Sequence, residues 1–302
     1  MGAEEAQAVP WAGVQEASAL NRGLHRQPGR QRAAAAAGRM TSTAEQGGNS
    51  VNTIQRVTSS IRRRLIKRGI PFVATITEFD HSGVRFQMSN PTEHFRVVSH
   101  GGETEYLAAM LGDLHSDDVL FDVGANIGMV SLHAAKICRT VAFEPDPSFR
   151  ERLNVNMGLN PDRVIAVEPI AVSDSDSTVQ LFTDGADGNS PSLVRSGESQ
   201  CVTVPSRSLD SLMAEGRLPR PTVIKLDIEG AEILALRGAK RLLTGPDRPR
   251  ALFIEVHDTY LPDFGSSAGE VHEILREYGY TDDVYRAKRD GQTHLILHRT
   301  MG

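Results

Sequence analysis

From Val119 onward, apolar runs of strand length alternate with stretches of helical periodicity, and this alternation most limits the folds open to the chain. Runs that are apolar on both faces are typical of parallel strands with helices on both sides of the sheet. Successive strand–helix units of this kind build a doubly wound sheet. The five runs are VLFDVG, TVAFEP, RVIAVEPIAV, TVIKLDIEG and ALFIEVH.

Capping residues mark the helices between these runs. Asp146 before Pro147 predicts the start of a helix, and Gly158 predicts its end. Ser267 and Glu270 form a capping box ahead of another apolar helical pattern. The final runs, DDVYRA and THLILH, are joined by KRDGQ, which predicts a hairpin. The expected fold class is therefore α/β, with a doubly wound sheet that is mostly parallel and ends in a C-terminal antiparallel hairpin.

Three segments of different composition predict the domain organisation. Residues 1–50 are expected to be a disordered leader, which is either an organelle transit peptide or sequence upstream of a true start at Met40. Residues 51–100 are expected to form an N-terminal helix and a small β extension, with strands at FVATITEF, GVRFQM and HFRVVS. Residues 101–302 are expected to form the main domain, beginning with a helix at ETEYLAAMLGDL.

Two further segments have open interpretations. The basic helix predicted at residues 51–69 either touches an acidic membrane surface or packs its apolar face on the domain and leaves its arginines in water. A Gly/Ser-rich insertion at residues 184–199 separates the predicted strands TVQLFTD and QCVTVPS. It is either a mobile lid or an ordinary surface loop.

Composition disfavours several classes of protein. The formal net charge is −5 at pH 7, so charge predicts no nucleic-acid partner. Cys138 and Cys201 have no paired spacing, and we expect two buried free thiols rather than a disulfide or a cysteine-built zinc site. Because no apolar run approaches about 20 residues and no secretory signal is visible, we expect a cytoplasmic protein without a transmembrane segment.

A glycine turn, FDVGANIG, follows the first strand of the alternating region. Gly124 allows a sharp turn and close approach of a ligand, and Gly128 lets the next helix begin beside the strand. Asp122 would repel a pyrophosphate but attract an ammonium or sulfonium group. Glu144 ends the second strand near the ~20-residue offset at which an acidic residue accepts ribose hydroxyls. The predicted ligand is an adenosine-type molecule whose other end is cationic.

The segments FDVGANIG, AFEPDP, AVSD, VIKLDIEGAEILALRGAKRLL and IEVH, in this order, resemble the FkbM-type S-adenosylmethionine-dependent methyltransferases over about residues 101–280. The resemblance implies a class I methyltransferase (Rossmann-like) fold and methylation of hydroxyl oxygens on sugars or polyketides. It implies S-adenosylmethionine as cofactor, with Glu144 at the ribose and with Ser173 and Asp174 at the adenine end. It also places four residues around the methionine half: Asp122, Gly124, Asn126 and Gly128.

Candidate catalytic residues stand at the ends of the fourth and fifth strands, which should converge over the transferred methyl group. They are Lys225, Asp227, Glu229, Glu255 and His257. His257 is the first choice of general base for an alcohol, because imidazole titrates near neutral pH, although a structural role fits its position equally. The two carboxylates on the fourth strand position the acceptor or act as base. An alternative, which the sequence alone does not favour, is that Asp227, Glu229, Glu255 and His257 ligate a divalent metal.

The function that these patterns predict is S-adenosylmethionine-dependent O-methylation of a hydroxyl on a small metabolite, sugar or glycan. One alternative is an NAD-dependent oxidoreductase, which DxGxxxG in place of GxGxxG disfavours. A second is a non-catalytic cofactor-binding scaffold. An N- or C-methyltransferase also remains open, although no NPPY-type motif follows the fourth strand. Neither the acceptor nor the oligomeric state is encoded in a readable motif.

Overall fold

The computed structural model describes residues 64–80, 82–183, 191–193, 200–289 and 291–300. The chain divides into two compact units, Met1–Arg64 and Leu65–Gly302, and the second holds every element named below. The predictions for residues 1–50, for most of the helix at 51–69 and for most of the insertion at 184–199 lie outside the described residues. None of the described helices is long and apolar enough to cross a membrane.

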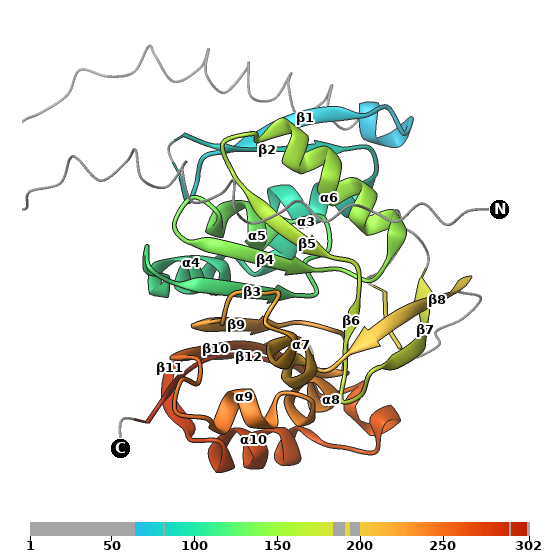
Figure 1. Cartoon of the computed structure of the whole chain (residues 1–302). Coiled ribbons are helices and arrows are strands. Elements are labelled where there is room, and N and C mark those ends of the chain that lie inside the picture. The colour runs from blue at the N-terminus through green and yellow to red at the C-terminus, as the bar shows by residue number, and fades with distance from the viewer. Residues whose placement is uncertain (1–63, 81, 184–190, 194–199, 290, 301–302) are drawn as a thin grey trace, which may run out of the picture. The chain divides into compact units, whose positions relative to one another are not determined.

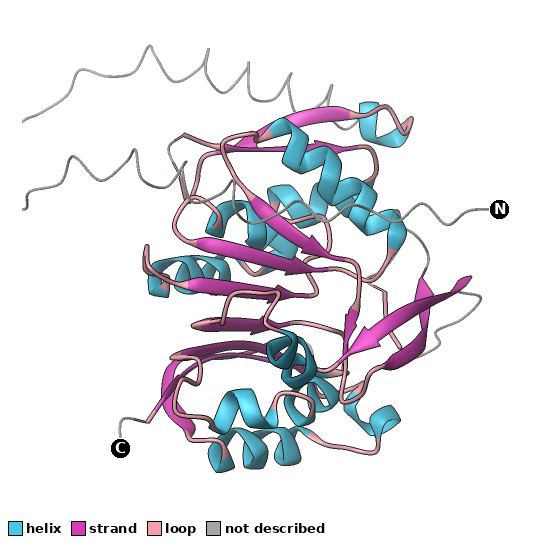
Figure 2. Cartoon of the chain, viewed as in Figure 1, coloured by secondary structure: helices cyan, strands magenta, loops and turns pink. Residues whose placement is uncertain are grey.

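A seven-stranded sheet forms the centre of the second unit, in the order β11-β12-β10-β9-β3-β4-β5 (Figures 1 and 2). β12 alone runs opposite to the other strands of this sheet, so it pairs antiparallel with both β10 and β11, and all other pairings are parallel. The predicted class of fold, mostly parallel with a C-terminal antiparallel hairpin, is confirmed. The strands are β3 (Val119–Val123), β4 (Arg139–Phe143), β5 (Ile165–Glu168), β9 (Val223–Leu226), β10 (Ala251–His257), β11 (Tyr280–Arg289) and β12 (Gln292–Arg299).

The point at which the strand order reverses lies between β3 and β9. The chain winds outward from β3 through β4 to β5, then returns to β9 on the other side of β3 and continues to β10. Such a reversal opens a crevice at the carboxyl ends of the two strands, where ligands bind in sheets of this kind. In the register of the sheet, Asp122 lies between Ala142 on β4 and Lys225 on β9.

Two smaller sheets flank the central one. β1 (Phe72–Ile76) pairs antiparallel with β2 (Val84–Met88). β8 (Gln200–Arg207) lies between β6 (Ala171–Val172) and β7 (Ser177–Thr183), and in Figure 1 this sheet stands beyond the arrowheads of β3 and β4. The run RVIAVEPIAV, predicted as one strand, is therefore divided between two sheets. Pro169, which has no N–H to donate to a ladder, stands at the division.

Side-chain caps fix the starts of several helices. Asp146 accepts hydrogen bonds from the N–H groups of Ser148 and Phe149, and Ser267 Oγ accepts one from Glu270 N. The helices are α3 (Pro91–Val98), α4 (Thr104–Asp113), α5 (Met129–Ala134), α6 (Pro147–Leu159), α7 (Leu209–Glu215), α8 (Glu232–Arg237), α9 (Lys240–Thr244) and α10 (Ala268–Glu277), with 3₁₀ turns η2 (His100–Gly102) and η3 (Leu261–Phe264).

Three local predictions are wrong. HFRVVS lies in α3 rather than in a strand, because Asn90 caps the segment by accepting from Glu93 N and Pro91 occupies the first helical turn. Gly158 lies inside α6, which ends at Leu159 with Asn160 as its C-cap. Cys201, on β8, is exposed, whereas Cys138 is buried as expected.

A buried arginine ties the β1–β2 turn to the central domain. Arg163 is 3% exposed, and its guanidinium donates to Asp80 Oδ2 at 2.5 Å, to Gly83 O at 3.0 Å and to Leu132 O at 3.1 Å. Asp80→Asn should therefore lower the free energy of unfolding by about 3 kcal/mol, because the arginine charge stays buried without its partner.

Urea unfolding at pH 7 measures this change. The matched control is Asp162→Asn in the exposed Lys136–Asp162 pair, at 3.5 Å, which should cost less than about 0.5 kcal/mol. Equal losses in the two variants would contradict the structural role of Arg163.

Candidate active site

The turn after β3 passes very close to the turn after β9. Gly124 has φ +81°, and its N–H donates to Phe143 O at 3.0 Å. A Cβ at this position would lie 1.9 Å from the backbone oxygen of Asp227, so only glycine is accommodated. The two turns therefore form a single continuous surface at the carboxyl ends of β3 and β9.

Glu144 follows β4 and supports the same turn. Its Oε2 accepts from Asn126 N at 2.7 Å and its Oε1 accepts from Asp146 N at 2.9 Å. Burial raises the pKa of this carboxyl to about 7, although the two backbone donors oppose the rise. Each oxygen of a carboxylate has a second lone pair, so Glu144 can still accept hydroxyl groups from a ligand.

A pocket of about 610 Å³ lies over these strand ends, and we call it the strand-end pocket. Three of the predicted cofactor-binding residues line it, Gly124, Asn126 and Glu144, together with the predicted catalytic residues Asp227 and Glu229. Most of the remaining wall is apolar, and includes Phe143, Ile170, Ala171, Val172, Leu181 and Leu193.

The other predicted cofactor residues lie outside this lining. Asp122 is fully buried under the turn, where Ser131 Oγ donates to it at 2.5 Å. At Gly128, φ is +91° and a Cβ would lie 2.5 Å from a side-chain carbon of Leu153, so this glycine lets α5 begin against α6.

Ser173 and Asp174 also lie outside the lining. Ser173 is buried and its N–H donates to Arg207 O at 2.9 Å, whereas Asp174 is exposed. The apolar residues 170–172, which come directly before Ser173 in the chain, line the strand-end pocket instead.

A second cavity of about 1830 Å³, which we call the carboxylate cleft, adjoins the strand-end pocket. Its walls come from α3, η2, α4 and the ends of β9 and β10. Four residues line both cavities: Gly124, Asn126, Asp227 and Glu229. Asn126 and Glu229 each have φ +54°, a conformation that costs energy for residues other than glycine and is often found at functional sites.

Lys225 is a buried cation that connects the two turns. Its Nζ lies 3.2 Å from Asp122 Oδ1 and 3.1 Å from Asp227 Oδ2, and it donates to Gly124 O at 3.1 Å. Burial alone would lower the pKa of Lys225, but the two carboxylates outweigh it and raise the pKa. Lys225 therefore keeps its proton, and this geometry does not favour it as a base.

The same ion pair lowers the pKa of Asp227. Burial alone would raise its pKa, but the Lys225 ammonium lowers it, so the carboxylate is charged at neutral pH. Its Oδ2 faces Lys225, and its Oδ1 faces His257 Nε2 at 3.9 Å.

His257 lies at the end of β10 and is 1% exposed. Its Nδ1 is 2.8 Å from Glu232 Oε1, and its Nε2 faces Glu229 Oε2 at 3.5 Å and Glu255 Oε1 at 3.6 Å. Burial opposes the imidazolium, but the hydrogen bond to Glu232 and the surrounding carboxylates raise the pKa of His257 to about 10. An imidazole that already holds a proton cannot accept another, so this arrangement disfavours the role of base expected for it.

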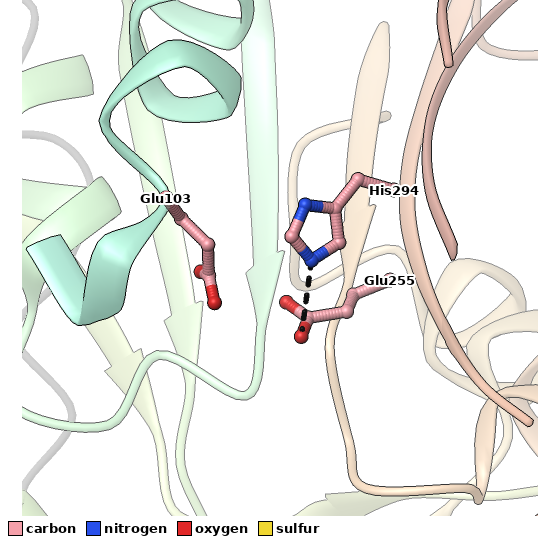
Figure 3. A group of neighbouring side chains, drawn as sticks. All are labelled: Glu103, Glu255 and His294. Atoms are coloured by element: carbon pink, nitrogen blue, oxygen red, sulfur yellow. Dashed lines mark ion pairs between the residues drawn. The ribbon is translucent and has the colours of Figure 1, made fainter. Parts of the chain in front are cut away.

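Glu255 also belongs to a second group, with Glu103 and His294. Figure 3 shows the Glu103 carboxylate, from the start of α4, facing a pair formed by Glu255 on β10 and His294 on β12. His294 Nε2 lies 3.4 Å from Glu255 Oε1. Burial and the charges of neighbouring carboxylates raise the pKa values of Glu103 and Glu255 to about 8 each.

The sequence interpretation missed Glu103, Glu232 and His294. A signal for Glu232 existed, because LDIEGAE places a second glutamate three residues after Glu229 at the start of a helix. No local signal marks Glu103 or His294, which are far apart in the chain. Pairing of β12 with β10 sets His294 opposite Glu255, and Glu103 reaches them from the start of α4.

The strand order, the glycine turn at the reversal point and the acidic residue after β4 define a class I methyltransferase fold. The model of the methyltransferase FkbM domain matches residues 122–281, more than half of the chain. The chain therefore belongs to the FkbM methyltransferase family, and not to the nicotinamide-dependent dehydrogenases weighed as an alternative.

Curated relatives share modest identity with this chain. A hexuronic acid methyltransferase, AglP, of Haloferax volcanii is 27% identical over 225 residues, which cover 74% of this chain and 89% of that protein. A 2-O-methyltransferase, NoeI, of Sinorhizobium fredii is 29% identical over 164 residues, which cover 48% of this chain and 65% of that protein.

Solved structures include a methyltransferase FkbM from Methylobacillus flagellatus. It is 20% identical with a TM-score of 0.45, and the match covers 64% of this chain and 48% of that chain.

Proposed function

We propose that this chain is an S-adenosylmethionine-dependent O-methyltransferase that acts on a hydroxyl of a sugar or glycan. The observation that carries the proposal is the junction of the two cavities, at which Gly124, Asn126, Asp227 and Glu229 line both. A cofactor in the strand-end pocket would present its reactive end to the carboxylate cleft. Membership of the FkbM family and the two relatives named above support this reading.

The residues of the strand-end pocket fit the parts of the cofactor. Glu144, held by two backbone N–H groups, has lone pairs for the two ribose hydroxyls. The apolar wall formed by Ile170, Val172 and Leu181 suits the faces of an adenine ring. Gly124 allows the backbone to approach the remainder of the molecule. When bound, S-adenosylmethionine supplies a sulfonium methyl group that is open to direct displacement.

The residues of the carboxylate cleft would align the acceptor and accept its proton. Asp227 and Glu229 lie at the junction, and their carboxylates can accept a hydrogen bond from an acceptor hydroxyl. Arg96 and Arg289 are in the wall of the same cleft, and guanidinium groups recognise carboxylates. Uronic acids are therefore the first acceptors to test, in agreement with the name of the Haloferax relative.

Two measurements test the proposal. Isothermal titration with S-adenosylhomocysteine tests the pocket, and a methyl-transfer assay with S-adenosylmethionine and a panel of free and glycosidic uronic acids and neutral sugars tests the reaction. Binding followed by formation of a methyl ether supports the proposal. Binding without turnover on any hydroxylated acceptor would favour the cofactor-binding scaffold, and absence of binding by folded protein would refute the cofactor assignment.

The pKa of Glu144 predicts how cofactor affinity depends on pH. Because that pKa is raised to about 7, the carboxyl is mostly protonated at pH 6 and mostly ionised at pH 8. The ionised form accepts both ribose hydroxyls, so affinity for S-adenosylhomocysteine should rise about tenfold from pH 6 to pH 8. Asp146, beside it, and Arg150, whose guanidinium donates to Glu144 O at 3.1 Å, are the charged groups that influence this carboxyl most.

The variant Glu144→Gln keeps the shape of the side chain and removes its titration. Its affinity should be lower than that of the wild type at pH 8 and nearly constant across the range. Titration calorimetry at three pH values measures both proteins. A wild-type affinity that does not change with pH, or a variant that retains the full pH dependence, would contradict the role of Glu144.

A further inference from the structure

The side chain of His257 is buried in a way that its own hydrogen bonds do not explain. It is 1% exposed, and Nδ1 is taken up by Glu232 Oε1 at 2.8 Å. Within the described part of the chain, Nε2 has no hydrogen-bond partner, although it is buried. Burial of a polar atom without a hydrogen-bond partner is rare and costs free energy, so this nitrogen is a candidate ligand for a bound ion or molecule.

Carboxylate oxygens surround this nitrogen at distances too long for hydrogen bonds. Glu229 Oε2 lies 3.5 Å away, Glu255 Oε1 3.6 Å and Asp227 Oδ1 3.9 Å. Ligand atoms that each sit about 2.1 Å from one dication are roughly 3–4.2 Å apart. The ligand atoms of Asp227, Glu229 and His257 all lie within 4.8 Å of one another, so one ion can reach all three after small side-chain movements.

The surroundings hold these three groups in place. Glu232 Oε1 accepts from the N–H groups of Ile228 and Gly230 at 3.2 and 3.0 Å, so one carboxylate orients both the imidazole and the turn that carries Glu229. A carboxylate that fixes the free nitrogen of a ligand histidine is the usual support of a metal site. Lys225 holds the other oxygen of Asp227 at 3.1 Å.

We propose that Asp227, Glu229 and His257 bind one divalent first-row cation of the Mn²⁺ type, with Glu255 beside the ion. One imidazole and two carboxylates suit such an ion better than Ca²⁺, which takes oxygen ligands, or Cu⁺, which takes sulfur. Two carboxylates balance the charge of a dication, and the ion takes the place of the proton that these carboxylates hold on His257 Nε2 in its absence. The binding does not depend on the proposed function, but its consequence does: an ion at the junction of the two cavities lies where an acceptor hydroxyl would be polarised.

The experiment measures Mn²⁺ binding by full-length protein that has been treated with a chelator, without cofactor or acceptor. Titration calorimetry and the electron paramagnetic resonance signal of free Mn²⁺ report affinity and stoichiometry. The variants are His257→Gln, Glu229→Gln and Glu232→Gln. The matched control is His298→Gln, because His298 forms another histidine–carboxylate pair, with Nε2 2.9 Å from Asp113 Oδ1, and it lies outside both cavities.

The expected result is one ion per chain, with binding lost in His257→Gln and Glu229→Gln. Glu232→Gln should bind about 10–100-fold more weakly, since it removes only the support of the ligand. His298→Gln should bind as the wild type does. Wild-type protein that leaves millimolar Mn²⁺ free, or variants that bind unchanged, would overturn the proposal. S-adenosylhomocysteine binding, measured on the same samples, separates this result from failure of the proposed function and from loss of folding.

Discussion

Asp227→Asn should lower kcat for methyl transfer by about 10²–10⁴-fold, the usual contribution of a group that handles the proton of the nucleophile. The substitution leaves size and shape unchanged but removes the negative charge from the junction of the two cavities. Lys225 retains Asp122 as a partner at 3.2 Å, so the buried ammonium is not left unpaired. Affinity for S-adenosylhomocysteine should change by less than about threefold, because the loss lies mainly in the transition state.

Single-turnover kinetics with a competent acceptor, together with calorimetry, measures both quantities. The matched control is Asp162→Asn, which changes an exposed carboxylate that lines neither cavity and should leave kcat unchanged. An Asp227→Asn enzyme with kcat within a few-fold of the wild type would show that Asp227 neither positions the acceptor nor receives its proton.

Gly124→Ala should weaken S-adenosylhomocysteine binding by at least about 100-fold, or about 2.7 kcal/mol. The added Cβ would stand 1.9 Å from the backbone oxygen of Asp227, and no rotation of a side chain can relieve a clash with backbone. The φ of +81° adds strain for alanine. The turns after β3 and β9 must therefore separate, and both carry residues that line the strand-end pocket.

Calorimetry and thermal unfolding test this prediction against Gly158→Ala. Gly158 lies within α6, and a Cβ there meets nothing within 4 Å, so alanine should stabilise the helix by about 0.5–1 kcal/mol without affecting binding. Retention of wild-type affinity by Gly124→Ala would mean that the contact between the two turns is not needed for the pocket.

The fold was largely predictable because its signals are local. Each core strand of the sheet is a short apolar run, and Asp146, Ser267 and Gly279 mark helix ends through caps or left-handed backbone. The spacing of apolar residues in HFRVVS fits either a strand or a helix, and the cap at Asn90 with Pro91 after it decides for the helix. Sequence spacing also could not show that β5 of the central sheet ends before Pro169 and that β6, which follows it, belongs to the three-stranded sheet.

The sequence by itself determined the class of the protein. The alternation of strands and helices, the glycine turn and Glu144 can each be recognised from residue pattern and spacing alone. It also marked five candidate catalytic residues at the ends of the fourth and fifth strands: Lys225, Asp227, Glu229, Glu255 and His257. Only the tertiary structure shows which charges surround each of these residues, because charge and solvation act through space. Pairing of β9 with β3 sets Lys225 between Asp122 and Asp227, and the start of α8 places Glu232 beside His257, an arrangement that favours a protonated imidazole over the expected base.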